Sequence, residues 1–282
     1  MNRDLLSLFG LKFNPFRPDI PLQALRLTPT IDSFCRRVEL SVDDGGFALI
    51  TGEPGTGKSV ALRLLAHRLQ GRRDVCVGAI DHPRSGLTDF YRELGELFDV
   101  PLPYNNRWVG FKSLRQRWSA HISSTSTRPV LIIDEAQEMH PSVLSEIRLL
   151  TSKSFDSHSL LCVILAGDHR LPDRLRHPDL LPLATRIRRR LLLGYADRDD
   201  LRASLDHLLD AAGNTALITD ALKSCLADHA AGNFRILMNM ADELLCAAAE
   251  RGSSHLDEQL FFHVFQPPAA NPRKKTARAK SA

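Results

Sequence analysis

The eight residues from Gly52 to Ser59 have the types and the spacing of a phosphate-binding loop. They read GEPGTGKS and fit the pattern G-x-x-x-x-G-K-[ST]. Glycines let such a loop curl until its backbone N–H groups point inward, and the positive end of the following helix also attracts phosphate. Lys58 is predicted to reach the β- and γ-phosphates of a nucleotide, and the Ser59 hydroxyl is predicted to bind Mg²⁺.

The context of this loop agrees with that chemistry. The apolar run FALIT at 47–51 precedes it, and the helical run VALRLLAHRL at 60–69 follows it. The mechanism needs a strand, a loop and a helix in this order. We therefore predict that the loop and the residue after it bind a nucleotide, the full set being Gly52, Glu53, Pro54, Gly55, Thr56, Gly57, Lys58, Ser59 and Val60.

A second pair of residues with suitable chemistry lies in VLIIDEAQ at 130–137. A strand that ends in acidic residues delivers Asp134 to the Mg²⁺ shell and places Glu135 to orient and polarise the attacking water. A signalling GTPase would carry a base-reading Asn-Lys-x-Asp motif, and the sequence contains none. The pattern therefore predicts Mg²⁺ bound with a nucleotide and argues against a signalling GTPase; ATP as the nucleotide is what the family resemblance described below implies.

The segments that must position these residues alternate between short β-rich runs and amphipathic helical stretches. Near-continuous apolar strands separated by helices indicate an α/β fold with a parallel sheet covered by helices on both faces. Residues 197–265 change character, with helical patterns and no clear strand, and predict a small all-helical domain. The expected strands are 47–51, 75–80, 130–134, 160–167 and 190–193.

These patterns divide the chain into four parts. We expect an N-terminal extension at 1–45, an α/β nucleotide-binding domain at 46–194, a helical lid domain at 195–266 and a disordered tail at 267–282. The tail holds five of the 37 basic residues and none of the acidic ones, so residues 1–266 carry 32 basic and 33 acidic residues. Its composition cannot bury apolar surface, and it is either a solubilising end or an arm for phosphates or a partner protein.

Composition also bounds the location of the protein. The longest nearly unbroken apolar run, LLCVILA at 160–166, is far shorter than the roughly 20 residues of a membrane span. The five cysteines are scattered and include no Cys-x-x-Cys pair, which argues against a disulfide framework and against a zinc site. We expect a cytoplasmic protein without a membrane partner.

The stretch YNNRWVGFKSLRQRW at 104–118 interleaves basic and aromatic residues. Its cations Arg107, Lys112 and Arg115 could follow DNA phosphates without reading sequence. The aromatic residues have roughly helical spacing, and we favour an ordinary buried stripe for them, made of Trp108, Phe111, Leu114 and Trp118.

The order of these motifs resembles that of the AAA+ ATPases, which are P-loop NTPases with a helical lid. Further stretches are similar to one branch, the ExeA-like ATPases and the related transposon ATPases of the TnsC, TniB and MuB type. The likeness covers roughly residues 8–245 and is carried by FGLKFNPF at 9–16, GGF at 45–47, LIIDEAQEM at 131–139, ILAGDHRL at 164–171 and GNFR at 232–235.

The resemblance implies an ATP-dependent homo-oligomer, a ring or a filament, with its site between neighbouring subunits. Lys58, Ser59, Asp134 and Glu135 would act within one subunit, and Arg235 resembles the lid arginine that reaches the γ-phosphate. Arg186 matches best the arginine that a neighbour contributes, although Arg188, Arg189 and Arg190 lie close by in the sequence. Guanidinium groups suit this role because they stabilise charge on the γ-phosphoryl oxygens.

One residue departs from the family pattern. Many AAA+ proteins carry a neutral polar residue after the fourth strand, whereas this chain has Asp168. An acid near phosphates is repelled unless Mg²⁺ or an arginine compensates its charge. This leaves two alternatives. Either Asp168 senses the nucleotide through water or an arginine, or ATP hydrolysis by this protein is slow.

The resemblance implies three functions. The first is a regulator of transposition that oligomerises on duplex DNA, selects a target and recruits or activates a transposase until ATP hydrolysis dismantles the assembly. The second is an ExeA-like ATPase of secretion or envelope assembly, and the third a helicase loader or replication initiator. We favour the first, because ExeA-type proteins typically add a membrane span and a wall-binding region, and this sequence shows neither. We also expect ATP hydrolysis to be slow and to be stimulated by DNA or a partner.

Overall fold

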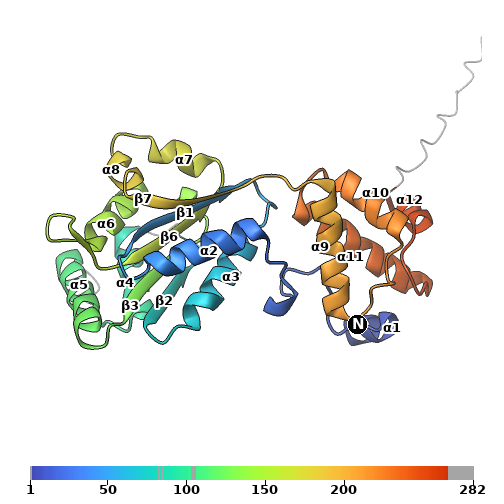
Figure 1. The fold of residues 1–282 in the computed structure, drawn as a ribbon, viewed down its shortest axis with the longest axis horizontal. Helices are drawn as coiled ribbons and strands as arrows, with labels where there is room; N and C mark the ends of the chain where they lie inside the picture. The colour runs from blue at the N-terminus through green and yellow to red at the C-terminus, as the bar shows by residue number, and fades with distance from the viewer. Residues whose placement is uncertain (1, 82, 84–85, 103–105, 266–282) are drawn as a thin grey trace, which may run out of the picture.

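The computed structural model describes residues 2–81, 83, 86–102 and 106–265. Within them, five strands form one parallel sheet in the order β2-β3-β6-β1-β7 (Figure 1). Near-continuous apolar strands predict such a doubly covered sheet, and this prediction is confirmed. The strands are β1 (Gly46–Gly52), β2 (Val75–Ile80), β3 (Arg128–Ile133), β6 (Cys162–Gly167) and β7 (Ile187–Leu193).

Alternate residues of the central strands face two separate cores. In β3, Val130 and Ile132 pack with the helices of one face, whereas Leu131 and Ile133 pack with those of the other. The first face is covered by α2 (Pro29–Ser41) and α3 (Lys58–Gln70), and the second chiefly by α4 (Leu87–Leu97), α5 (Arg107–Ser124), α6 (Pro141–Thr151), α7 (Arg170–Leu175) and α8 (Leu181–Ala184). Because the strands are parallel, their carboxyl ends meet at one edge of the sheet.

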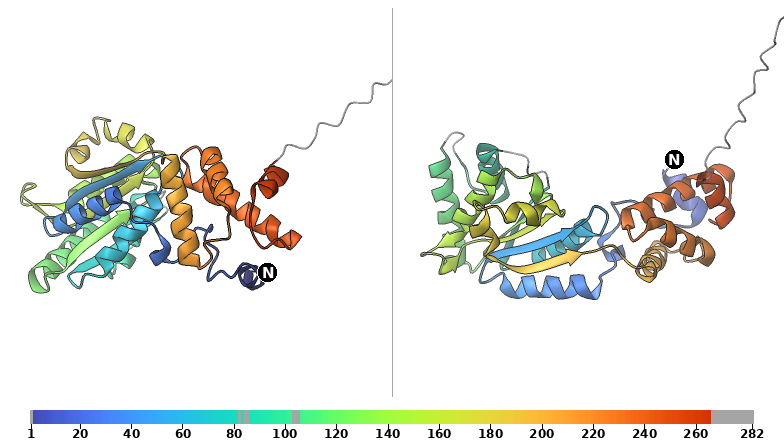
Figure 2. Two further views of the ribbon diagram at one scale, coloured as in Figure 1. Left: turned by 45° about the vertical axis from the view of Figure 1, so that its right-hand side comes forward. Right: turned by 90° about the horizontal axis from the view of Figure 1, so that it is seen from above.

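The helical lid follows β7. It consists of α9 (Arg198–Ala212), α10 (Asp220–Ala230), α11 (Phe234–Arg251) and α12 (Glu258–Phe265), and its only extended pairing among the described residues is an isolated bridge between Ile218 and Leu256. Figure 2 shows the lid beside the α/β domain, joined to it by the segment after β7. None of the described helices has both the length and the apolarity needed to cross a bilayer.

The N-terminal extension does not behave as one unit. Helix α1 (Asn2–Phe9) and the segment after it pack on the lid, where Phe9, Leu11 and Phe16 join the lid core. The 3-10 helix η1 (Leu22–Ala24) and α2 pack instead on the sheet. Residues 2–45 therefore connect both domains, which their sequence pattern does not predict.

The remaining differences are local. A short antiparallel pair, β4 (Ser152–Lys153) with β5 (His158–Ser159), precedes β6 and was not predicted. The buried stripe expected in α5 is only partly correct: Leu114 and Trp118 are buried, but Trp108 is 61% exposed and stacks on Phe111. The predicted disordered tail, residues 267–282, lies outside the described residues.

Candidate functional site

The loop between β1 and α3 has the conformation that its glycines predict. Gly55 and Gly57 have φ of +85° and +101°, a backbone region that favours glycine. A Cβ added to Gly52 would lie 2.6 Å from Thr56 Oγ1 and 2.5 Å from the Leu193 carbonyl oxygen, so the start of the loop admits no side chain. The turns and close packing leave the loop backbone curled ahead of the first turn of α3, as phosphate binding requires.

Lys58 points back into this loop. Its Nζ donates to the carbonyl oxygens of Gly52 at 2.8 Å and Glu53 at 3.1 Å, and the residue is only 7% exposed. Ser59 is the next residue of α3 and is exposed, as a ligand to an incoming metal ion should be. The first turn of α3 thus supplies an ammonium group and a hydroxyl beside the loop.

Asp134 follows the last residue of β3 and is half-buried. Burial raises the pKa of Asp134, and the carboxylates of Glu135 and Asp81 raise it further. Two groups oppose this shift: the Glu135 N–H, which donates to Asp134 Oδ1 at 2.9 Å, and the Lys58 ammonium. A desolvated carboxylate that senses Lys58 is suited to a divalent cation. Asp134 and the Ser59 hydroxyl are both oxygen donors, which Mg²⁺ prefers, so these residues fit the metal that ATP brings.

Glu135 adopts a left-handed backbone conformation, with φ of +50°, and its side chain is exposed. Such a conformation is costly for a residue with a Cβ and persists only where the surroundings impose it. Here Gln137, which is buried, donates through Nε2 to Glu135 Oε2, and its Oε1 accepts the N–H of Asp168 at 3.2 Å. Gln137 therefore ties the glutamate to the end of β6.

Asp168 is buried at the end of β6 and is paired with an arginine. Arg170 Nε lies 2.8 Å from Asp168 Oδ2, and Arg170 Nη2 reaches Glu138 Oε1 at 2.8 Å. Burial by itself would raise the pKa of Asp168, but the hydrogen bonds from the Arg170 side chain and backbone N–H outweigh it, so the pKa is lowered. The carboxylate is thus ionised and its charge is compensated by Arg170, a residue to which the sequence analysis assigned no role.

The lid contacts the phosphate loop at the start of α11. The first residue of α11, Phe234, donates its N–H to the carbonyl oxygen of Gly55 at 3.0 Å. Arg235, the next residue, is exposed at this junction. The structure therefore brings the predicted lid arginine to the same end of the sheet as the loop, although the sequence places it 180 residues further along the chain.

Arg186 lies at the opposite end of the sheet. It precedes Ile187, the first residue of β7, whereas the loop follows Gly52, which pairs with Leu193 at the other end of that strand. Six steps along the strand separate Ile187 from Leu193, or about 20 Å. Arg186 and the exposed Arg188 line a cavity of about 960 Å³ together with the loop between β4 and β5, and Arg186 is paired there with Asp156. Arg190 donates to the Ala184 carbonyl oxygen at 3.3 Å, and Arg189 is half-buried.

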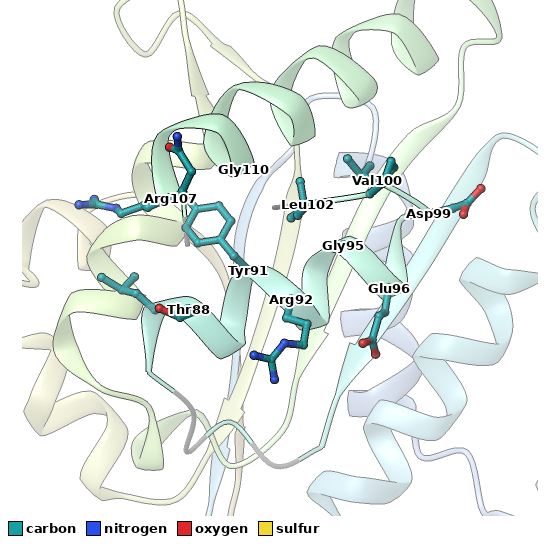
Figure 3. Close-up of a pocket in the computed structure, with 13 residues that line it drawn as sticks. Thr88, Tyr91, Arg92, Gly95, Glu96, Asp99, Val100, Leu102, Arg107 and Gly110 are labelled. Carbon is teal, nitrogen blue, oxygen red and sulfur yellow. The ribbon is translucent and has the colours of Figure 1, made fainter. Parts of the chain in front are cut away.

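Two of the three cations expected to contact DNA have partners within the domain. Arg107 Nε donates to Glu146 Oε1 at 3.0 Å, and this carboxylate, only 2% exposed, also accepts the hydroxyl of Tyr91. Tyr91 and Arg107 line a pocket of about 700 Å³ between α4 and α5 (Figure 3). Arg115 donates to the Leu149 and Leu150 carbonyl oxygens at the end of α6.

Lys112 is placed differently from the two arginines. Its Nζ lies 4.8 Å from the centre of the exposed Trp108 ring, and the residue itself is exposed. Helix α5 contains no aspartate or glutamate. Its outer face is therefore basic and partly aromatic, while Arg107 and Arg115 stabilise the contact between α5 and α6.

Comparison with known proteins agrees with this geometry. A family model described as an AAA domain matches residues 41–175. The chain is similar to General secretion pathway protein A of Aeromonas hydrophila, with 34% identity over 215 residues; the match covers 75% of this chain and 38% of that relative. This chain thus corresponds to well under half of the relative's length.

The fold is shared with solved structures of much lower identity. Cdc6p from Pyrobaculum aerophilum matches with a TM-score of 0.69 and 17% identity, over 86% of this chain and 67% of that one. The Aeropyrum pernix ORC1 protein in complex with DNA matches with a TM-score of 0.69 and 16% identity, over 89% of this chain and 67% of that one. The chain therefore has the AAA+ P-loop NTPase fold and carries an AAA-family ATPase domain.

Proposed function

We propose that this chain is an ATP-dependent switch that assembles into an oligomer when ATP is bound and disassembles after hydrolysis. When bound, ATP supplies the phosphoanhydride bond that is broken. Lys58 and the loop N–H groups hold its phosphates, Asp134 and Ser59 hold its Mg²⁺, and Glu135 accepts a proton from the attacking water. Arg235 contacts the γ-phosphate from the lid of the same subunit.

The separation of Arg186 from the loop supports the oligomer. Because Arg186 lies at the amino end of β7 and the loop at the carboxyl end of β1, it does not reach the nucleotide of its own subunit. A neighbouring subunit that places this end of its sheet against the loop would complete the site. In such an assembly, hydrolysis would depend on the neighbouring subunit. The separation of Arg186 from the loop of its own subunit is the observation on which the proposal rests.

We further propose that the assembled form binds duplex DNA and recruits or activates a transposase. The support is the acid-free helix α5, whose outer face presents Lys112 and the exposed Arg117. In an oligomer, the α5 faces of successive subunits would contact the phosphates along a DNA duplex without reading its sequence. Since Arg107 and Arg115 are held by groups of the domain, Lys112 is the main DNA contact that we propose from the three expected cations.

A second candidate is an ATPase of secretion or envelope assembly. The observation that favours it is the 34% identity to General secretion pathway protein A over 215 residues, or 75% of this chain. Both candidates need the same nucleotide site and the same assembly, and they differ in what the oligomer binds. DNA binding therefore separates them.

The deciding experiment is a gel mobility-shift measurement, in which the purified protein is added to random-sequence duplex DNA. It is run with ATP, ADP or no nucleotide, at low and moderate salt. ATP-dependent rings or filaments on DNA in negative-stain images, lost as salt rises, are expected. Lys58→Ala should lose both ATP binding and assembly, because the ammonium that holds the phosphates is gone. A protein that binds ATP but no DNA in any nucleotide state would overturn the DNA proposal in favour of the secretion candidate.

A further inference from the structure

Asn233, the residue before α11, makes hydrogen bonds in two directions. Its side-chain Oδ1 accepts the N–H groups of Arg235 at 2.9 Å and Ile236 at 3.2 Å, which caps the first turn of the helix. Its Nδ2 donates to the carbonyl oxygen of Pro54 in the phosphate loop at 2.9 Å. One amide side chain therefore joins the lid helix that carries Arg235 to the nucleotide loop.

The contact on the loop side is close and has two points. The Pro54 carbonyl accepts from Asn233, and the carbonyl of the next residue, Gly55, accepts from the Phe234 N–H at 3.0 Å. A Cβ added to Gly55 would lie 2.0 Å from Asn233 Oδ1. Glycine at this position thus serves the approach of the lid as well as the left-handed turn of the loop.

The contact on the lid side is equally constrained. Gly232 has φ of +84°, and a Cβ there would lie 2.7 Å from the Tyr195 Cβ and 2.8 Å from the Ala196 carbonyl oxygen. The Ala196 N–H donates to the Gly232 carbonyl oxygen at 2.9 Å. The turn before α11 is therefore anchored to the segment that connects β7 with the lid, so Asn233 is held in place from behind.

The geometry of the peptide bond links these contacts to phosphate binding. In a trans peptide the C=O and the N–H point in opposite directions from one rigid plane. The Pro54 C=O and the Gly55 N–H belong to one such unit, and the Gly55 C=O and the Thr56 N–H belong to the next. When the lid holds the two carbonyls on its side, the two N–H groups are turned away from the lid.

We propose that Asn233 is a positioning residue that couples the phosphate loop to the lid. By holding the Pro54 carbonyl it orients the Gly55 N–H for phosphate, and a phosphate that holds this N–H fixes in return the start of α11 and Arg235. The coupling is reciprocal, because each binding event favours the same loop conformation. The inference rests on ATP binding at the loop, which Lys58→Ala tests separately.

The test uses Asn233→Ser. Serine remains a good helix cap, but its short hydroxyl side chain lacks the amide that donates to the Pro54 carbonyl oxygen. The matched control is Asn106→Ser, since Asn106 caps α5 through the Val109 N–H at 3.1 Å and has no contact with the loop among the described residues. Titration with a fluorescent N-methylanthraniloyl ATP is expected to show roughly three- to tenfold weaker binding in Asn233→Ser, the loss of one hydrogen bond. Asn106→Ser should bind as the wild type does.

Hydrogen exchange of the first turn of α11 supplies a second readout that a cap alone does not move. In the wild type and in Asn106→Ser, a saturating non-hydrolysable ATP analogue should increase protection of the Arg235 and Ile236 amides. Asn233→Ser should lose this increase. Asn233→Asp keeps the cap with an isosteric side chain that cannot donate to Pro54, and it should also lose the increase even if the serine variant is unstable.

The outcomes separate the two claims. Wild-type ATP affinity together with nucleotide-dependent protection in both Asn233 variants would overturn the coupling role and leave the proposed function intact. A wild-type protein that does not bind ATP would overturn the proposed function, and the coupling role with it.

Discussion

At the residue scale, the chemistry is concentrated where β1, β3 and β6 end. Lys58 points into the loop, and its charge opposes the rise in the pKa of Asp134. Glu135 has a left-handed backbone conformation, and its side chain accepts a hydrogen bond from Gln137. The buried amide of Gln137 also accepts the Asp168 N–H, so it links the glutamate to the end of β6. In the proposed mechanism, the other Glu135 oxygen, Oε1, accepts the proton of the attacking water.

Glu135→Gln tests the role of this glutamate. The amide cannot accept a proton from water, so hydrolysis should fall by about 10²–10⁴-fold while ATP binding is kept. The assembled form should therefore accumulate when ATP is added. Phosphate release, ATP affinity and light scattering measure these three effects, and Glu250→Gln, an exposed change at the far end of α11, is the control. Turnover at the wild-type rate would remove Glu135 from catalysis.

At the element scale, the N-terminal helix belongs to the lid although it begins the chain. Phe9 and Phe16 are buried with residues of α9, α10, α11 and α12, and Asn14 Nδ2 donates to Asp242 Oδ1 at 2.7 Å. The next helix, α2, lies on the sheet. Residues 10–28 consequently form a second connection between the two domains, besides the segment after β7 (Figures 1 and 2).

Phe9→Ala should weaken the lid more than the sheet. Removal of a buried phenylalanine costs about 3–5 kcal/mol, because apolar contact is lost and a cavity remains. Urea unfolding and hydrogen exchange should show earlier opening of α9–α12, with β1, β3 and β6 still protected. Leu40→Ala, at an exposed position of α2, serves as the comparison and should change the free energy of unfolding little. Uniform loss of protection in both domains would contradict the assignment of α1 to the lid.

At the scale of the whole molecule, the two ends of the sheet carry the residues that the proposed oligomer would bring together in one site. The loop, Asp134 and Arg235 gather at the carboxyl ends of the strands, and Arg186 lies at the amino end of β7. In the isolated chain Arg186 is paired with Asp156. Assembly would exchange this surface carboxylate for the phosphate of a neighbour.

Mixing two inactive variants tests a shared site. Arg186→Ala keeps its own loop but offers no arginine, and Glu135→Gln offers the arginine and still assembles with ATP but hydrolyses it slowly. Each alone should hydrolyse ATP slowly, and their mixture should recover activity that rises with the proportion of mixed neighbours. The same mixing with Arg188→Ala, Arg189→Ala and Arg190→Ala identifies which arginine acts. Activity equal to the sum of the separate proteins in every mixture would exclude a site between subunits.

The sequence by itself determined the P-loop, the Asp134–Glu135 strand end, the five strands of the sheet and the helical lid. These features are local: a phosphate loop needs contiguous glycines before a helix start, and a buried parallel strand needs a short apolar run. Gln137 and Asn233 stood inside the quoted motifs DEAQ and GNFR, yet the sequence assigned them no role. Their contacts to Asp168 and to Pro54 reach other elements and cannot be read from their own segments.

Only the tertiary structure decided which distant residues meet. Asn233 contacts Pro54 across 179 positions of the chain, and Arg107 neutralises the buried Glu146 from another helix. The exposure of Trp108 and the packing of α1 on the lid were likewise settled by neighbouring elements. Residue type and periodicity report what a segment can form. Strand order and helix packing set which of its side chains find partners, and that depends on the whole chain.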